Sequence, residues 1–308
     1  MTTIGDYVSH YEELLNKAGI SDARLEVLYM LSEITGKTST QLSLAMRDVW
    51  NFSPEVEDEL EKASRRRAKH EPVAYIFERA YFYNEVYACG PGVLIPRPDT
   101  ELLVEKAFEK VTSQTNRQIR IIDLCTGTGC VGISLTNELT KSGFHCTTYL
   151  IDIDDTALDF ARKNLSTQLK RNSGMMPEVS VIKADVLDSE NIIRLFGHSD
   201  SYTIIVSNPP YITDSDMKTL DDDVKLYEPS IALYGGEGDA TIFYKALSKI
   251  AVNILSGDEC ILAEHGYDQR ESVGKIFSES GLSNVVCYKD YGGNDRVTVG
   301  IRTCMDGE

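Results

Sequence analysis

The sequence lacks the features that would place it in a membrane or in a secretory pathway. Its 308 residues contain no uninterrupted apolar run long enough to cross a bilayer, and its start shows no charged segment followed by an apolar stretch and a small-residue cleavage site. A transmembrane helix needs about 20 apolar residues, and a secretory leader needs the second pattern. We therefore expect a cytoplasmic protein with no membrane association, built from one large and one small domain.

The cysteines lack paired spacing. They are odd in number, scattered, and free of any Cys-x-x-Cys pair. Disulfide-stabilised domains and structural zinc sites both depend on such pairs. We expect reduced thiols and no metal site. The seven are Cys89, Cys125, Cys130, Cys146, Cys260, Cys287 and Cys304.

Concentrated positive charge is scarce. Asp and Glu number 48 against 31 Lys and Arg, which gives a formal net charge of -17. The only basic run, residues 65–70, sits in a helical pattern where it offsets the acidic stretch at residues 55–61. A protein that binds the phosphate backbone of a nucleic acid needs a basic surface. Free duplex DNA is therefore a poor substrate, and we expect no direct nucleic-acid binding.

The chain divides into three segments that differ in composition and in hydrophobic pattern. Residues 1–71 carry apolar positions at helical spacing and the cap-then-proline start Ser53-Pro54, which predicts a small all-α domain. Residues 72–98 are aromatic and β-branched, broken by Asn84-Glu85 and by glycines, which predicts a hairpin connector. Residues 99–308 form the remaining, larger domain.

The large domain alternates strand-like and helical patterns, which predicts a parallel, doubly wound α/β sheet. Two final runs flank the turn sequence at residues 291–295, which predicts an antiparallel hairpin. A parallel sheet that ends in such a hairpin is typical of class I (Rossmann-like) methyltransferases. The predicted strands are residues 119–124, 147–151, 179–182, 203–206, 259–263, 285–289 and 296–301.

A glycine loop follows the first predicted strand of this domain. Gly127, Gly129 and Gly132 allow the backbone to approach a ligand closely, and ligands of open α/β sheets bind at the carboxyl ends of strands. The same glycines satisfy the dinucleotide pattern G-x-G-x-x-G. The loop alone therefore indicates a cofactor without separating NAD from S-adenosylmethionine.

Two acidic residues follow the next two strands. Asp152 is placed to accept both ribose hydroxyls, and the alternative, a helix cap, suits Asp154 or Asp155 better. Asp185 is placed to accept from an adenine amino group, and a surface turn explains it equally well.

The most informative motif is Asn208-Pro209-Pro210-Tyr211, after the fourth strand. Two prolines remove N–H donors and leave carbonyl acceptors, which suits a bound NH2 group. Asn208 can accept one N–H, the Pro209 carbonyl the other, and Tyr211 can pack on the planar group. A rigid surface turn is the alternative. The order of the motifs favours methylation of an amide or amino nitrogen.

From about residue 71 to 301 the chain resembles the HemK/PrmC family of protein-(glutamine-N5) methyltransferases, which act on class-1 peptide chain release factors. The resemblance rests on the glycine loop, the Asn208 motif and four further stretches. These are residues 94–101, 227–236, 264–266 and 290–296.

The resemblance implies S-adenosylmethionine as cofactor, with S-adenosylhomocysteine as product, and a release-factor glutamine as substrate. Asn208, Pro209, Pro210 and Tyr211 form the implied glutamine pocket, the catalytic group. The implied cofactor contacts are Cys125, Thr126, Gly127, Thr128, Gly129, Asp152, Asp185, Val186 and Asn208.

Several positions stay open at this point. Arg97 and Glu101 lie in the stretch that resembles the substrate entrance, but Arg97 could equally pair with Asp99 or Glu101. Cys125 stands where the family usually has glycine, and Val186 where some members have an aromatic residue. His265 could be a base, although a hydrogen-bonded structural histidine is the favoured interpretation.

Two other functions remain possible from the residues. The first is N6-adenine or N2-guanine methylation of nucleic acid, because those planar amines fit the same acceptors. The second is an NAD-binding redox protein. We expect a monomer whose partners are class-1 release factors.

Overall fold

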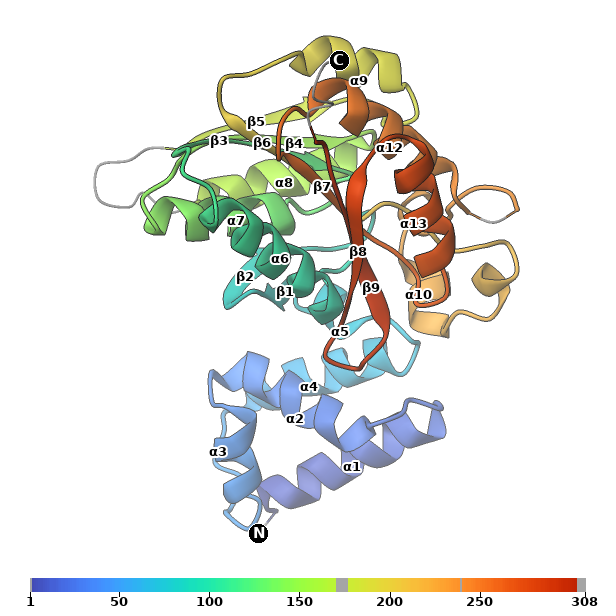
Figure 1. The fold of residues 1–308 in the computed structure, drawn as a ribbon. Helices are drawn as coiled ribbons and strands as arrows, with labels where there is room; N and C mark the ends of the chain where they lie inside the picture. Colours follow the sequence, from blue (N-terminus) through green and yellow to red (C-terminus); the bar gives the residue numbers. More distant parts are fainter. Residues whose placement is uncertain (1, 170–176, 239, 304–308) are drawn as a thin grey trace, which may run out of the picture. The chain divides into compact units, whose positions relative to one another are not determined.

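The computed structural model describes residues 2–169, 177–238 and 240–303. The chain forms two compact units, and the colours of Figure 1 follow the sequence from blue at the N-terminus to red at the C-terminus. One comprises Met1–Arg79 with Leu220–Tyr227, and the other Ala80–Thr219 with Glu228–Glu308. The domain boundaries expected at residues 71 and 98 remain predictions. Six of the seven cysteines are free thiols, and Cys304 lies outside the described residues.

The smaller unit is helical, as predicted. A capping box between Thr3 and Asp6 starts its first helix, and Pro54 occupies the first turn of its fourth. Apolar residues two turns apart, such as Val8 and Leu15, are fully buried in its core. The helices are α1 (Ile4–Lys17), α2 (Ala23–Thr35), α3 (Ser39–Leu44), α4 (Pro54–Arg67), α5 (Val73–Ile76) and α10 (Asp222–Tyr227).

A two-stranded hairpin follows α5. Strands β1 (Arg79–Phe82) and β2 (Glu85–Ala88) pair with each other. The two residues between them, Tyr83 and Asn84, both have positive φ, of 50° and 62°. That backbone is the one a two-residue hairpin turn requires, because it matches the twist of the paired strands.

The larger unit is built on a seven-stranded sheet with the order β5-β4-β3-β6-β7-β9-β8. Neighbours from β5 to β7 run parallel, and β9 runs antiparallel to both β7 and β8. The predicted fold class, a parallel sheet that ends in an antiparallel hairpin, is confirmed. The strands are β3 (Gln118–Leu124), β4 (His145–Asp152), β5 (Glu178–Lys183), β6 (Tyr202–Ser207), β7 (Cys260–Glu264), β8 (Ser283–Lys289) and β9 (Asp295–Ile301).

Helices cover both faces of this sheet (Figure 1). Successive residues of β3 point to opposite faces, so Ile121 joins the core under α6, α7 and α8, and Ile122 joins the core under α9, α12 and α13. The helical segments are η1 (Pro98–Thr100), α6 (Glu101–Thr112), α7 (Cys130–Lys141), α8 (Asp155–Gln168), α9 (Ser189–Phe196), η2 (Asp216–Lys218), α11 (Ser230–Leu233), α12 (Ile242–Ile254) and α13 (Arg270–Glu279).

The strand order reverses between β3 and β6, because the chain leaves β3 toward β4 on one side and returns to β6 on the other. Such a switch point opens a crevice at the carboxyl ends of the strands, where ligands of doubly wound sheets bind. Within the described ranges, no helix is both long and apolar enough to cross a membrane. No group of three or more potential metal ligands is found among those same residues.

Candidate active site

A cavity of about 270 Å³ lies at the carboxyl ends of β3 to β6, within the larger unit. Most of its wall is apolar, with a few convergent polar groups, which is the usual character of a small-molecule site. Most residues predicted to contact a cofactor or substrate line it. They are Arg97, Cys125, Thr126, Gly127, Thr128, Asp152, Asp185, Val186, Asn208 and Pro210.

Four predicted residues do not line the cavity. Gly129 is the residue before α7, where its φ of 81° turns the chain into the helix. Pro209 and Tyr211 lie in the loop after β6, beside two residues that do line it. The carboxylate of Glu101 accepts a hydrogen bond of 2.9 Å from the backbone of Tyr83, so it ties α6 to the hairpin turn.

Asp123, at the carboxyl end of β3, organises the glycine loop. Its Oδ2 accepts hydrogen bonds from the Thr126 hydroxyl at 2.6 Å and from the Gly132 backbone at 2.9 Å. These contacts hold the loop and the first turn of α7 to one buried carboxyl. Burial raises the pKa of Asp123 to about 7, although both hydrogen bonds oppose the rise.

Two residues of the glycine loop, on either side of Thr126, have positive φ. Cys125 has a φ of 60° and Gly127 one of 55°, both in the left-handed region. A non-glycine residue there is strained. Glycine adopts this backbone freely, so Cys125 holds it at a conformational cost.

Asp152 faces the same loop from the end of β4. Its two oxygens accept from the backbones of Gly127 at 2.9 Å and Asp154 at 3.1 Å, and each keeps a further lone pair. Burial raises its pKa. Asp154 is the cap of α8, accepting from Ala157 at 3.0 Å, as the sequence indicated. Asp152 is thereby left facing the cavity.

Asp185 and Val186 follow β5 and line the far part of the cavity wall. The Asp185 carboxylate accepts from the Leu187 backbone at 2.8 Å, which forms a tight turn. Asp185 is therefore a turn aspartate that also lines the cavity, and its contact with an adenine amino group stays a prediction. Val186 is buried and offers an apolar surface without an aromatic ring.

The Asn208 loop starts where β6 ends, and Ser207 anchors it through a hydrogen bond of 2.7 Å to the Leu124 carbonyl. The Asn208 amide nitrogen donates to the Thr100 hydroxyl at 3.1 Å. With its NH2 group engaged there, the side-chain oxygen of Asn208 remains as an acceptor.

Tyr211 is fixed at both ends. Its backbone carbonyl accepts from the Gln269 side chain at 3.0 Å, and its hydroxyl donates a long hydrogen bond of 3.5 Å to Glu264. Burial raises the pKa of the Tyr211 hydroxyl, so it stays neutral. Gly235 packs against its backbone, where an added Cβ would lie 2.8 Å from the Tyr211 Cα. Gln269, Glu264 and Gly235 therefore fix the backbone and the hydroxyl of Tyr211.

Arg97 pairs with Glu228, which lies more than 100 residues further along the chain, and not with Asp99 or Glu101. The expected alternative pairing was wrong because it considered only neighbours along the chain. Glu228 is buried and also accepts from the Ile95 backbone at 3.1 Å. Asp99 instead pairs with Arg296 at 3.4 Å.

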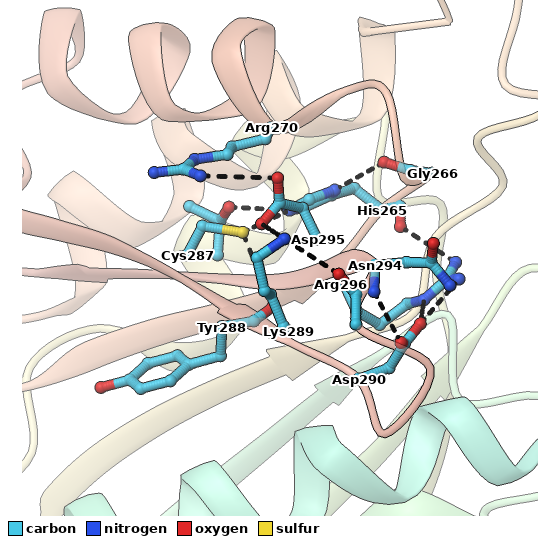
Figure 2. Close-up of polar contacts among 12 residues, drawn as sticks. His265, Gly266, Arg270, Cys287, Tyr288, Lys289, Asp290, Asn294, Asp295 and Arg296 are labelled. Carbon is cyan, nitrogen blue, oxygen red and sulfur yellow. Dashed lines mark hydrogen bonds and ion pairs between the residues drawn. The ribbon is translucent and has the colours of Figure 1, made fainter.

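His265 is fully buried and does not line the cavity. Its ring nitrogens contact the Gly266 carbonyl and the Thr298 hydroxyl, each at 2.8 Å. Burial lowers its pKa, so the ring is neutral. Figure 2 shows this histidine beside Arg296, whose guanidinium reaches the His265 carbonyl and Asp290. The contacts are those of a structural histidine.

Four residues that carry the site's geometry had no assigned role in the sequence. They are Thr100, Asp123, Glu228 and Glu264. All four lay within or beside quoted motifs. Only Asp123 offered a local signal, as an acid at the end of a buried strand before a glycine loop, whereas the partners of the other three come from distant segments.

Two family models match the chain. One is described as the PrmC N-terminal domain and matches residues 6–77, and the other is the methyltransferase small domain, which matches residues 98–223. A solved structure of a release factor-specific protein-(glutamine-N5) methyltransferase from Alicyclobacillus acidocaldarius is 26% identical, covering 70% of this chain and 99% of that one, at a TM-score of 0.38.

Curated relatives match over nearly the whole length. The release factor glutamine methyltransferase of Clostridium botulinum is 32% identical over 92% of this chain and 94% of its own. The protein of the same name from Haemophilus influenzae is 32% identical over 94% of each chain. The chain therefore belongs to the release factor glutamine methyltransferase family.

Proposed function

We propose that the protein transfers a methyl group from S-adenosylmethionine to the side-chain amide nitrogen of the glutamine in the Gly-Gly-Gln motif of class-1 release factors. The observation that carries the proposal is the Asn208 loop. Its amide is anchored by Thr100 through the nitrogen, so an acceptor oxygen remains beside a cofactor-type cavity.

The hydrogen-bond acceptors and the apolar surface of the cavity suit S-adenosylmethionine. Asp152 keeps lone pairs for the ribose hydroxyls, Asp185 and Val186 offer an acceptor and an apolar wall for adenine, and the glycine loop leaves room for the methionine part. When bound, the cofactor supplies a methyl group on a positively charged sulfur. The carboxylates of Asp152, Asp154 and Asp185 in its wall favour a cation there.

The chain's own contribution is positioning and charge stabilisation. Asn208 Oδ1 and the Pro209 carbonyl each accept one N–H of the substrate amide, which turns its nitrogen toward the methyl group. Alignment of this kind lowers barriers by up to roughly 7 to 11 kcal/mol. The acceptors bind more strongly as positive charge develops on the nitrogen, so they favour the transition state over the ground state.

No dedicated base is required by this scheme. His265 is buried and neutral, with both ring nitrogens engaged away from the cavity. After transfer, the amide nitrogen becomes acidic and can release its proton to water. The NAD-binding alternative has no support in the family assignment. Adenine or guanine amines fit the same acceptors, so the assay must separate them.

We further infer that the protein works as a cytoplasmic monomer whose partners are class-1 release factors, without direct nucleic-acid binding. Release factors act in translation, which supports the location. The formal charge of -17 supports the exclusion of nucleic acid, since phosphate backbones repel an acidic surface.

The experiment combines purified protein, labelled S-adenosylmethionine and a class-1 release factor. Asn208→Ala removes the acceptor, and we expect transfer to fall about 100- to 1,000-fold while the dissociation constant of the cofactor changes little. Asn253→Ala, at an exposed position on α12, is the matched control and should keep wild-type activity. Full activity of Asn208→Ala would refute the assigned role.

A further inference from the structure

Arg97 is the only positively charged side chain in the described wall of the cofactor cavity. Among the described residues that line the cavity there is no lysine, no histidine and no second arginine. The wall is otherwise acidic, since Asp123, Asp152, Asp154 and Asp185 also line it. Opposite charges attract more strongly beside an apolar wall than in water, so Arg97 marks the place where an anionic group of a ligand is favoured.

A buried carboxylate holds the guanidinium of Arg97 and leaves part of it open. Its Nη2 pairs with Glu228, whose side chain is 1% exposed and also accepts from the Ile95 backbone at 3.1 Å. Within the described ranges, Arg97 makes no other hydrogen bond. A guanidinium has five N–H donors, and this side chain is 37% exposed. The donors on Nε and Nη1 are therefore available to a ligand.

The segment that carries Arg97 runs between the two loops of the site. Four residues before it, Val93 lies beside the glycine loop, where a Cβ added to Gly127 would meet its Cγ2 at 3.9 Å. Three residues after it, the Thr100 hydroxyl accepts from the Asn208 amide at 3.1 Å. Arg97 therefore stands on the stretch of cavity wall that joins the glycine loop to the Asn208 loop.

S-adenosylmethionine has a single anionic group, the α-carboxylate of its methionine part. With the ribose at Asp152, the sulfur must lie toward Asn208 for its methyl group to meet a substrate nitrogen, and the methionine part extends from that sulfur. The stretch between the two loops is the part of the wall that this end of the molecule faces. A planar guanidinium matches a carboxylate with two parallel hydrogen bonds.

We propose that Arg97 binds the α-carboxylate of the cofactor and that Glu228 is the positioning residue that holds the guanidinium for this contact. A free arginine side chain in the same wall would pair with the aspartates that the ribose needs. The pair with Glu228 prevents this, because it fixes Nη2 on the side of the connector segment. The assignment holds whichever nitrogen receives the methyl group.

The test compares two ligands that differ only in the carboxylate. They are S-adenosylhomocysteine and its decarboxylated analogue, which keeps the amino group, and calorimetric titration gives both dissociation constants without any release factor. We expect the wild type to bind S-adenosylhomocysteine roughly 10- to 100-fold more tightly than the analogue, the usual effect of a charge-assisted hydrogen bond. Arg97→Met should bind the two ligands about equally, because it loses the group that distinguishes them.

Two further variants separate the charge of Arg97 from its position. Arg97→Lys keeps the charge without the planar fork, so it should retain only part of the preference for the carboxylate. Glu228→Gln should also lower that preference, with little change in the affinity of the decarboxylated analogue, since Glu228 acts only through Arg97. A purely structural role would weaken both ligands by the same factor.

Arg79 offers a matched control. It is 41% exposed and pairs with Glu33, whose side chain is 3% exposed, so it repeats the half-exposed arginine on a buried glutamate. It does not line the cavity. Arg79→Met should therefore keep the wild-type preference for S-adenosylhomocysteine. If Arg97→Met does not fold because Glu228 is left unpaired, the double variant Arg97→Met with Glu228→Gln removes that charge and is titrated instead.

An unchanged preference for the carboxylate in Arg97→Met overturns the proposal, and so does an equal loss of affinity for both ligands. A higher KM for a class-1 release factor, with the ligand preference intact, would assign Arg97 to the peptide and also overturn it. Failure of the wild type to methylate a release factor refutes only the proposed function, because the titrations contain no methyl acceptor.

Discussion

Asp123 and Glu264 are both buried carboxyl groups, and burial raises the pKa of each to about 7. They differ in their partners. Asp123 Oδ2 holds two donors of the glycine loop, whereas Glu264 Oε2 has none among the described residues. Hydrogen bonds therefore offset part of the desolvation cost of Asp123, and they offset less of that cost at Glu264.

This difference predicts how stability changes when Glu264 becomes glutamine. In the unfolded chain the acid ionises near 4.5, but in the fold it stays protonated up to about 7. The wild type therefore loses free energy of unfolding as pH rises between these values. Glu264→Gln avoids that loss, by roughly 3 kcal/mol at most, so it should be more stable than the wild type at pH 8.

Urea titrations at pH 4 and pH 8 measure this prediction. The stability advantage of Glu264→Gln over the wild type should be small at pH 4 and larger at pH 8. A variant that is less stable than the wild type at alkaline pH would contradict burial as the cause of the raised pKa.

Sequence reasoning found cavity-lining residues where they lie at the ends of strands or directly after them. Asp152, Asp185 and Asn208 could be placed because carboxyl ends of parallel strands meet at one edge. Thr100, Glu228 and Glu264 could not be assigned, since each acts through a partner more than 50 residues away. Side-chain pairing over such separations depends on the folded arrangement, which local pattern does not encode.

The presence of each sheet strand was predicted correctly, but several of the residues at which strands begin or end were not. The strand expected at residues 259–263 is Cys260–Glu264. Glu259 stays outside it because its carboxylate accepts from the backbones of Thr203 and Ser256, both at 2.7 Å. Hydropathy cannot tell such a loop-organising acid from a strand residue, so the strand end was misplaced by one residue.

Two helical glycines provide a test at the level of whole elements. An added Cβ at Gly132 in α7 would overlap Leu150 and lie 2.9 Å from Asp123 Oδ2. At Gly274 in α13 it would meet only Val285 at 3.9 Å, an ordinary contact. The same substitution therefore has opposite consequences in the two helices.

We expect Gly132→Ala to destabilise the fold by about 1 to 3 kcal/mol and to weaken cofactor binding, because α7 must move away from β4 and the glycine loop. Gly274→Ala should stabilise by about 0.5 to 1 kcal/mol, through higher helix propensity. Denaturant unfolding measures both. Equal effects of the two variants would show that helix–sheet packing at Gly132 is looser than described.

The pairing of the basic residues in α4 argues against nucleic acid as a substrate. The basic run in α4 forms ion pairs within the smaller unit, so it is not a free cationic surface. Arg65, Arg66 and Arg67 pair with Glu61, Glu71 and Glu26, respectively. These contacts agree with the interpretation of a helix whose charges offset each other.

The sheet and the loops at its carboxyl edge combine into one arrangement. The switch point between β3 and β6 places the glycine loop and the Asn208 loop on adjacent strands. A cofactor held by the first loop and an amide held by the second therefore meet at one edge. The arrangement of the strands therefore brings the cofactor and the substrate amide close together, independently of the side chains that act in the reaction.

The most direct test is to locate the methyl group. A class-1 release factor, incubated with the protein and S-adenosylmethionine in the presence of competing RNA and DNA, is digested and sequenced by mass spectrometry. We predict one methyl group on the Gly-Gly-Gln glutamine and no label on nucleic acid. A methyl group on another residue, or label on the nucleic acid, would contradict the account.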